Sequence, residues 1–253
     1  MNDIDPFSLL DKRLLITGAS SGIGRQAAIS CAAMGAQLVI TGRNFERLQE
    51  TANNLEGEGH VLITADLTQE KEISSLAEQA GQINGILHAA GISKLAPVRM
   101  IRKSHLEEML SHNTCAPILL TKELLAKRKI AKNGSIVFIS AIASHVGPLA
   151  SSAYSASKAA LLGATRSLAL EVAKQGIRVN CLSPGYVRTP MLDGLVQDGL
   201  GTDGNYKLGP LGIGEPEDIA YAAIFFLSDA SRWITRNYFI MDGGLTVPMD
   251  IYA

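Results

Sequence analysis

Cysteine is scarce in this sequence, and long apolar runs are missing. The three cysteines, Cys31, Cys115 and Cys181, are far apart and form no CxxC pair. This argues against a disulfide framework and predicts buried thiols in a reducing compartment. No apolar stretch reaches the ~18 residues that a membrane span needs, and the acidic beginning MNDID is unlike the basic start of a signal peptide. We therefore expect a soluble, cytoplasmic protein without a membrane partner.

A strong charge of one sign is also missing. The net charge is −1 over 253 residues, which gives no electrostatic reason to expect a nucleic acid or an anionic membrane as a partner. The five histidines show no metal-ligand spacing, so we expect no metal site; they are His60, His88, His105, His112 and His145. Apolar residues, in contrast, make up 47% of the chain, which is enough for a substantial core at this length.

Short β-branched runs alternate with amphipathic segments along the whole chain. The expected strands are Arg13–Thr17, Gln37–Thr41, Val61–Thr64, Gly85–His88, Ser135–Ser140, Arg178–Leu182 and Tyr238–Met241. The expected helices are Gly24–Met34, Glu46–Leu55, Lys71–Ala80, Ser104–Lys127, Ser155–Lys174 and Glu217–Leu227. Runs such as Leu14–Ile16 are apolar without alternation, which is typical of parallel strands covered on both faces. The pattern predicts an α/β fold with a doubly wound, Rossmann-type parallel sheet of about seven strands and helices on both faces.

No linker, charge block or low-complexity segment divides the chain, so we expect a single domain over residues 1–253. The irregular part is a glycine-rich stretch at about 190–214. A long glycine-rich excursion in a compact domain is more often a binding loop than a disordered insert. We predict that this stretch forms a substrate lid.

A glycine-rich turn, TGASSGIG, follows the first expected strand and opens the first expected helix. Glycines permit tight turning and let a pyrophosphate approach main-chain N–H groups at a helix N-terminus, although an ordinary packed turn also contains them. The position at the first strand-to-helix turn favours a dinucleotide site. The predicted cofactor-binding residues of this turn are Gly18, Ser20, Ser21, Gly22, Ile23 and Gly24.

The second strand ends in Gly42 and Arg43, where a fold selective for NAD usually places an acid. A guanidinium favours a 2′-phosphate, so NADP is the predicted cofactor and NAD is less favoured. The alternative is that Arg43 only caps a solvated turn. Asp66, after the third strand, is a candidate acceptor for an adenine amino group, with a helix N-cap as its alternative role.

Tyr154 and Lys158 are four residues apart on an expected helix, so their side chains share a face. A tyrosine with a pKa near ~10 is a poor proton donor at neutral pH. An ammonium group beside it favours the phenolate and lowers the pKa of the tyrosine toward the working pH. Taken alone, the pair also fits an ordinary helix surface.

Several motifs in the right order change that interpretation. TGASSGIG, the Tyr154–Lys158 pair and Pro184-Gly185 beyond the next strand make the chain resemble the short-chain dehydrogenase/reductase family, and most closely its 3-oxoacyl-carrier-protein reductases. The resemblance covers nearly the whole chain, from about residue 12 to residue 246.

The resemblance implies a role for each motif residue. Tyr154 is the acid or base at the substrate oxygen, Lys158 holds the nicotinamide ribose and tunes the tyrosine, and Asn113 helps to order a relay water. The further residues that it places at the cofactor are Leu67, Ala90, Gly91, Pro184, Gly185, Val187 and Thr189. It also implies a homo-oligomer, either a tetramer or a dimer.

A proline lies four residues after Asn113. Because Pro117 has no N–H, the carbonyl oxygen of Asn113 loses its usual helical partner. We expect this carbonyl to hold a water, unless the proline only kinks the helix for packing.

The chain departs from the family pattern where a catalytic serine usually stands, thirteen residues before the tyrosine, because that position is Ala141. Neighbouring strand residues point to opposite faces, so Ser140 on a regular strand would point away. Three possibilities follow: a slip at the strand end turns Ser140 inward, Ser144 reaches in from the loop, or no hydroxyl is present. We predict Ser140 as the catalytic serine. A second departure is His88-Ala89 in place of the Asn-Asn that often precedes Ala-Gly in the family.

We therefore expect an NADP(H)-dependent oxidoreductase that interconverts a carbonyl and a secondary alcohol in a small molecule, with 3-oxoacyl reduction as one form. The glycine-rich lid has few aromatics and the sequence has no obvious basic patch for a carrier protein, so a small polar or sugar-like ketone is an alternative substrate. Because of Ala141, we also consider a function other than catalysis: a catalytically impaired cofactor-binding regulator or partner subunit.

Overall fold

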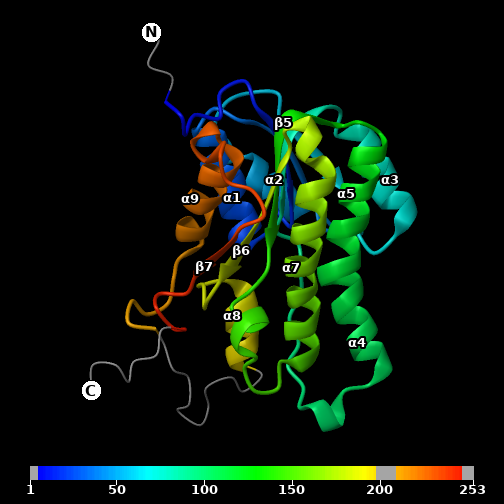
Figure 1. The fold of residues 1–253 in the computed structure, drawn as a ribbon, viewed down its shortest axis with the longest axis vertical. Coiled ribbons are helices and arrows are strands. Elements are labelled where there is room, and N and C mark those ends of the chain that lie inside the picture. The colour runs from blue at the N-terminus through cyan, green and yellow to red at the C-terminus, as the bar shows by residue number, and fades with distance from the viewer. Residues whose placement is uncertain (1–4, 198–208, 247–253) are drawn as a thin grey trace.

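The sheet at the centre of the molecule is parallel throughout and has seven strands in the order β3-β2-β1-β4-β5-β6-β7. A computed structural model describes residues 5–197 and 209–246. The strands are β1 Arg13–Thr17, β2 Gln37–Gly42, β3 Val61–Thr64, β4 Ile83–His88, β5 Ile130–Ile139, β6 Arg178–Pro184 and β7 Tyr238–Met241. The predicted α/β fold with a doubly wound sheet is confirmed (Figure 1).

Helices connect the strands and cover both faces of the sheet (Figure 1). The α-helices are α1 Gly22–Ala33, α2 Phe45–Ala52, α3 Glu70–Gln79, α4 Lys103–Leu110, α5 Ala116–Ala126, α6 Ala143–Val146, α7 Ser152–Val172, α8 Pro190–Gln197 and α9 Pro216–Leu227. Shorter turns are the 3₁₀ segments Val98–Met100, Ala173–Gln175 and Asp229–Ser231 and the π-helical turn Ser111–Cys115. Helices α6 and α8 were not among the predicted elements.

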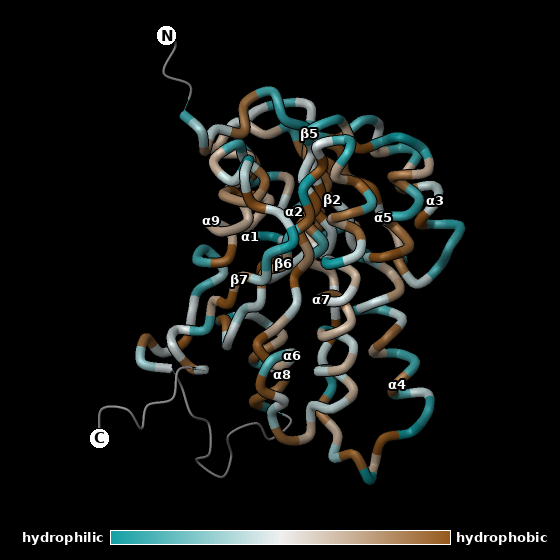
Figure 2. The backbone as a smooth tube through the Cα atoms, in the orientation of Figure 1, coloured by the Kyte–Doolittle hydropathy of each residue, from teal (hydrophilic) through white to brown (hydrophobic). Residues whose placement is uncertain are grey.

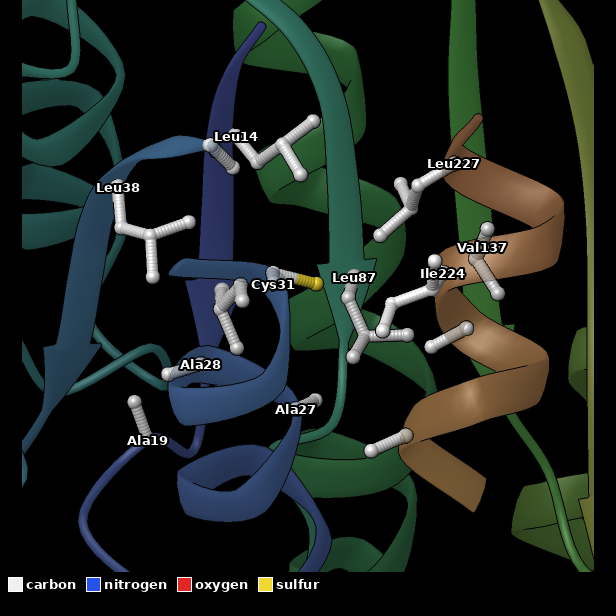
Figure 3. Close-up of a cluster of buried hydrophobic side chains, with 14 of the residues drawn as sticks. Leu14, Ala19, Ala27, Ala28, Cys31, Leu38, Leu87, Val137, Ile224 and Leu227 are labelled. Atoms are coloured by element: carbon white, nitrogen blue, oxygen red, sulfur yellow. The ribbon is translucent and has the colours of Figure 1, made fainter. Parts of the chain in front are cut away.

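The core consists of two apolar layers, one on each face of the sheet. Leu14 and Ile16 of β1 belong to the layer under α1, α2 and α9, while Leu15 between them belongs to the layer under α3, α5 and α7. This division explains why the strand is apolar without alternation. Figure 3 shows side chains of α1 and α9, including Cys31 and Ile224, meeting over the strands.

Hydropathy follows the same arrangement along the backbone. Figure 2 shows hydrophobic residues concentrated in the central strands and hydrophilic residues in the outer turns. In the part of the chain that the structure describes, no helix is long and apolar enough to cross a membrane. Cys31 and Cys181 are buried as predicted, but Cys115 is exposed, so the expectation of three buried thiols is wrong for that residue.

The predicted helix Ser104–Lys127 is interrupted. Helix α4 ends at Leu110, a π-helical turn covers Ser111–Cys115, and α5 begins at Ala116 with Pro117 in its first turn. A proline cannot donate the hydrogen bond that a continuous helix would need at that position, and π-bulges are frequent at functional sites. The interruption places Asn113 inside the π-helical turn.

The sheet reverses its strand order between β1 and β4. The chain winds from β1 toward β3 on one side and from β4 toward β7 on the other, so the loops after β1 and β4 diverge to opposite faces and leave a crevice at the carboxyl ends of these strands. Ligands of open α/β sheets bind at this kind of crevice. The predicted lid begins beside it as α8, and residues 198–208 of that lid lie outside the described part of the chain.

Candidate active site

A groove of about 290 Å³ lies at the carboxyl ends of β1, β2 and β4. It brings together twelve of the residues predicted to bind a cofactor: Gly18, Ser20, Ser21, Gly22, Ile23, Gly24, Arg43, Asp66, Leu67, Ala90, Gly91 and Thr189. It also contains residues that the sequence argument missed, among them Arg47, Thr68, Ile92 and His112. The predicted positions therefore form one continuous site.

The floor of the groove has room for phosphate because it lacks side chains. Gly18 has φ +68°, and a Cβ there would lie 2.8 Å from the Cα of Ala90; a Cβ on Gly24 would overlap the carbonyl oxygen of Gly18. Helix α1 starts at Gly22 without a side-chain cap and without an acid in its first turn. Its free N–H groups and positive dipole end fit the pyrophosphate of a dinucleotide.

The far end of the groove is basic. A Cβ on Gly42 would overlap Oγ of Ser20, so a side chain at position 42 would force the Ser20 hydroxyl to turn away. The Ser20 hydroxyl is buried and has no partner among the described residues. Asn44 caps α2 by accepting a hydrogen bond from Arg47 N at 2.7 Å, and both Arg43 and Arg47 line the groove. Two guanidinium groups and a free hydroxyl suit a phosphate on the ribose.

Asp66 does not cap a helix, because the N-cap of α3 is Gln69. Its carboxylate accepts hydrogen bonds from N of Thr68 at 2.9 Å and from Oγ1 of Thr68 at 2.8 Å. These hydrogen bonds lower the pKa of Asp66, and the nearby charge of Arg43 lowers it further. A carboxylate that is ionised and faces the groove is able to accept from an adenine amino group.

A second cavity, of about 150 Å³, continues from the groove and shares five residues with it: Ile23, Ala89, Gly91, Thr189 and Met191. It contains the predicted residues Ser140, Tyr154, Lys158, Pro184, Gly185 and Val187. The two cavities together form a channel with a larger part at the carboxyl ends of β1, β2 and β4 and a smaller part beside Tyr154.

Tyr154 and Lys158 both lie on α7, one turn apart, at the inner end of the second cavity. Burial raises the pKa of Tyr154 to about 12 and lowers the pKa of Lys158 to about 8. Lys158 Nζ donates to the carbonyl oxygen of Ile139 at 2.8 Å. The expected lowering of the tyrosine pKa by the lysine is therefore not found in the protein itself, where burial is the dominant effect.

Asn113 fixes the loop after β4 against α7. Its Oδ1 accepts from N of Ile92 at 2.9 Å, and its Nδ2 donates to O of Ile92 at 2.9 Å and to Oγ of Ser157 at 3.0 Å. Gly91 makes this contact possible, because a Cβ there would lie 2.9 Å from Asn113 Oδ1 and 3.1 Å from Lys158 Nζ. Asn113 thus joins the loop after β4, which lines both cavities, to helix α7.

Ser140 follows the last residue of β5, so strand alternation no longer fixes its direction. Its hydroxyl lies 3.0 Å from the carbonyl oxygen of Lys158 and 3.1 Å from Oγ of Ser144. Ser144 donates to O of Ala141 at 2.6 Å, so the single proton of Ser140 goes to the Lys158 carbonyl or to Ser144. Ser140 faces α7 and lines the cavity, and its hydroxyl is engaged by the protein.

Comparison with known proteins agrees with this geometry. The family profile described as enoyl-(acyl carrier protein) reductase matches residues 18–246. A mouse (Mus musculus) 3-oxoacyl-[acyl-carrier-protein] reductase is 36% identical over 244 residues, which cover 93% of this chain and 98% of the relative. A solved protein of the short-chain dehydrogenase/reductase family is 33% identical with a TM-score of 0.84, covering 94% of this chain and 98% of its own. The chain is a member of the short-chain dehydrogenase/reductase family.

A further structural relative bears on the cofactor and the substrate. A Beutenbergia cavernae protein assigned as an NAD(P)-dependent gluconate 5-dehydrogenase, solved with NADP bound at low occupancy, is 32% identical. Its TM-score is 0.86, and the match covers 95% of this chain and 99% of that protein. As a short-chain dehydrogenase/reductase, the present protein is an oxidoreductase that uses a nicotinamide cofactor.

This short-chain dehydrogenase/reductase has a histidine where an amide is common in the family. The ring of His88 stacks on Phe138 with centroids 4.9 Å apart, and its Nε2 lies 2.9 Å from Oγ1 of Thr121. Since Thr121 donates to O of Pro117 at 2.8 Å, His88 is the donor, and burial lowers its pKa to about 3. His88 is thus a neutral residue that holds β4 against α5, and no cluster of potential metal ligands occurs in residues 5–197 and 209–246.

Proposed function

We propose that this protein is an NADP(H)-dependent reductase of a carbonyl carried on an apolar chain, most simply a 3-oxoacyl thioester. The observation that carries the proposal is the lining of the cavity beside Tyr154. Its outer wall is formed by apolar side chains from three loops and helix α8: Leu95, Ile142, Leu149, Met191, Leu192 and Leu195. An acyl chain fits such a wall, whereas each hydroxyl of a sugar-like ketone would lose a hydrogen bond to water there.

The polar groups of the cavity lie around its inner end, where the carbonyl would sit. A bound nicotinamide cofactor supplies the hydride that the carbonyl carbon accepts. Tyr154 gives its proton to the carbonyl oxygen, which completes the alcohol. Lys158 holds a position next to the tyrosine through its bond to Ile139 O, and Asn113 keeps the loop after β4 in place. Pro184, Gly185, Val187 and Thr189 surround the expected nicotinamide end.

The preference for NADP(H) follows from the basic end of the groove. The absence of an acid at position 42, the free Ser20 hydroxyl and the two arginines of the groove, Arg43 and Arg47, all favour a 2′-phosphate. Replacing both arginines by alanine is expected to raise KM for NADPH by about 10- to 100-fold, the value of one or two charge-assisted contacts, while KM for NADH changes little.

Ser140 is better suited to positioning than to direct contact with the substrate. Its hydroxyl bridges the end of β5 and the backbone of α7 at Lys158. In this proposal it holds the lysine segment of α7 against the sheet, and Ala141 leaves the reaction without the usual serine donor. One missing oxyanion-type donor typically costs a factor of ~10²–10³ in rate, so we expect a slow but active enzyme.

The decisive experiment is a comparison of kcat/KM for three substrates with NADPH: a medium-chain 3-oxoacyl thioester, an unbranched aliphatic ketone and 5-ketogluconate. The proposal predicts a clear preference for the thioester and ketone. Preference for 5-ketogluconate would support the second candidate, an activity like that assigned to the gluconate 5-dehydrogenase relative. Turnover of no substrate, with tight NADPH binding retained, would favour a catalytically impaired cofactor-binding regulator or partner subunit.

We further propose that the protein is cytoplasmic and a homo-oligomer, a tetramer or a dimer. Strand β7 is at the edge of the sheet, and it is unusually exposed for an apolar strand, with Phe239 at 46% and Ile240 at 41%. Trp233, just before it, is 93% exposed. Exposed apolar edge strands without a covering element are normally paired or buried by a partner, and a second copy of this chain would cover this one.

A further inference from the structure

One hydroxyl in the wall of the substrate cavity has no partner in the protein. Ser93, in the loop between β4 and α4, lines the cavity beside Tyr154. Its Oγ is buried and forms no hydrogen bond with the residues that the structure describes, 5–197 and 209–246. A buried hydroxyl in this state has given up its hydrogen bonds to water without replacing them. The Ser93 hydroxyl is therefore available to a ligand of the cavity.

The other serine and threonine hydroxyls of this cavity wall are engaged by the protein. They belong to Ser140, Ser151 and Thr189. Ser140 lies 3.0 Å from the carbonyl oxygen of Lys158, while Ser151 and Thr189 each donate to a backbone carbonyl two or three residues earlier in the chain. Among the serines and threonines of the wall, Ser93 is thus the one whose proton is uncommitted.

The loop that carries Ser93 is held on both sides of it. Asn113 binds both N and O of Ile92, the residue just before Ser93, at 2.9 Å each. Ala96, three residues after Ser93, donates its N–H to O of Ala150 in the loop before α7 at 2.7 Å. A side chain on a backbone that is fixed in this way needs little reorganisation to bind a ligand.

The same loop passes beside the reacting groups. A Cβ on Gly91, two residues before Ser93, would lie 3.1 Å from Nζ of Lys158, and Tyr154 lies one turn before Lys158 on α7. Ala141, the position at which a serine is usual, lines the same cavity from the loop after β5. Because β4 and β5 are neighbours in the sheet, Ser93 and Ala141 reach the cavity from adjacent loops.

We propose that Ser93 is a further catalytic residue, whose hydroxyl donates a hydrogen bond to the carbonyl oxygen that Tyr154 protonates. This proposal rests on the proposed function. Rotation about the Cα–Cβ bond of Ser93 moves Oγ among three staggered positions, and no hydrogen bond to a described residue opposes that rotation. As hydride reaches the carbonyl carbon, negative charge develops on the oxygen. Ser93 stabilises this charge and keeps its own proton, while the proton of Tyr154 completes the alcohol. Ser93 thereby supplies part of the stabilisation that is missing at Ala141.

The test measures single-turnover oxidation of NADPH by the wild type, Ser93→Ala and Ser93→Thr. Two substrates are compared: a 3-oxoacyl thioester, which has two carbonyl groups, and an unbranched aliphatic ketone, which has one. Ser93→Ala should be about 10- to 100-fold slower with both substrates, a loss at or below the usual value of one oxyanion-type donor. Ser93→Thr keeps a hydroxyl and should retain most of the wild-type rate.

Thr41→Val is the matched control. Oγ1 of Thr41, on β2, is also buried without a partner among the described residues, but Thr41 lines neither cavity. This variant should therefore react at the wild-type rate. Neither Ser93→Ala nor Thr41→Val removes a hydrogen bond that the structure shows, so the midpoint of urea unfolding should be no lower in either variant than in the wild type. A slower reaction with an unchanged midpoint assigns the effect of Ser93 to the reaction and not to the fold.

A double variant tests whether the two positions serve the same oxygen. If they do, the Ala141→Ser substitution should raise the rate about 10-fold more in the Ser93→Ala background than in the wild type, because each hydroxyl then compensates for the lack of the other. An equal gain in both backgrounds would contradict a shared oxygen.

Three further results would overturn the role of Ser93 while leaving the proposed function intact. The first is an equal rate of the wild type and Ser93→Ala with both substrates. The second is a loss confined to the thioester, which would place Ser93 at the second carbonyl. The third is a lowered unfolding midpoint in Ser93→Ala, together with a rate that Ser93→Thr does not restore. If the wild type oxidises NADPH with neither substrate, the proposed function itself fails.

Discussion

Burial shifts the pKa values of Tyr154 and Lys158 in opposite directions, and both shifts favour the uncharged form. With its pKa raised to about 12, Tyr154 keeps its proton throughout the physiological range. With its pKa lowered to about 8, Lys158 is close to half-protonated in mildly alkaline solution. The proposed reduction starts from this protonated form of Tyr154, while the raised pKa by itself makes the phenol a weaker acid.

The lysine shift predicts a dependence of stability on pH. The folded protein releases the Lys158 proton near pH 8, whereas the unfolded chain keeps it to about pH 10.4. As pH rises through this window the unfolded state binds more protons, so folding gains stability. The difference in unfolding free energy between the wild type and Lys158→Met should shift in favour of the wild type by about 2 kcal/mol from pH 7.5 to pH 9.5. Urea unfolding at the two pH values measures it, and an unchanged difference would mean that Lys158 titrates at its ordinary pKa.

Ala141 offers a gain-of-function prediction. Its side chain lines the cavity next to Ser140, and the Ala141→Ser variant restores a hydroxyl at the position that the family normally uses. We expect turnover to rise by about 10-fold or more, part of the value of one oxyanion-type donor. Ala143→Ser is the matched control, since Ala143 lines the same cavity two residues later.

Ser140→Ala separates the two possible roles of Ser140. If Ser140 only positions Lys158, its loss should slow turnover by a few fold and Ala141→Ser should still raise it. No gain from Ala141→Ser, combined with a loss of ~10²–10³ in Ser140→Ala, would show that Ser140 is already the donor.

At the scale of elements, the π-helical turn Ser111–Cys115 links local structure to the site. Replacing Asn113 by alanine leaves both the N–H and the carbonyl of Ile92 without their partner. The loss of these two part-buried hydrogen bonds should lower the unfolding free energy by about 1–3 kcal/mol, and kcat should fall because the loop beside the nicotinamide end is released.

The control for Asn113→Ala is Asn84→Ala, which removes a similar bond to Arg13 N (2.8 Å) at the opposite end of β4. It should lower stability without lowering kcat. Denaturant unfolding and steady-state kinetics of the two variants distinguish a positioning role from a structural one, and an equal loss of kcat in both would contradict the role given to Asn113.

The elements show what a sequence is able to specify here. All seven strands were predicted, because parallel strands buried on both faces are continuously apolar. The break at Asn113 was visible only as Pro117, whose missing N–H implies an irregularity but not its type. Helix α6 has only four residues, Ala143–Val146, which is too short for any periodicity to appear. Helix α8 begins with Pro190, a signal that the glycine-rich surroundings concealed.

The sequence likewise predicts some residues of the candidate site and misses others. Motif residues such as Gly18 and Lys158 lie where expected. Arg47 was missed, although its place four residues after Arg43 at the start of a helix is a readable signal. The direction of the Ser140 side chain could not be predicted from the sequence, because it depends on where β5 ends. The pKa shifts of Tyr154 and Lys158 could not be predicted from the sequence, because they arise from burial in the folded protein.

At the scale of the whole molecule, the exposed edge strand β7 predicts assembly. Sedimentation equilibrium should give a mass that is a multiple of the 26.9 kDa chain. Phe239→Lys places a charge on the edge strand and should shift the protein toward the monomer, since charges on an edge oppose strand pairing. Leu170→Lys changes another exposed apolar residue (64%), on helix α7. Comparing the two variants shows whether the subunits associate through β7 or through this helix. A monomeric wild type would contradict the assembly proposal.

The central claim is that Tyr154 gives its proton to a substrate carbonyl during NADPH-dependent reduction. It is tested most directly by single-turnover oxidation of NADPH, followed by its absorbance, with a 3-oxoacyl thioester and either the wild type or Tyr154→Phe. Removing one general acid should slow the step by about 10²–10⁴-fold, with NADPH affinity nearly unchanged because the groove that binds it is intact. A Tyr154→Phe enzyme that reduces the substrate at the wild-type rate would contradict the claim.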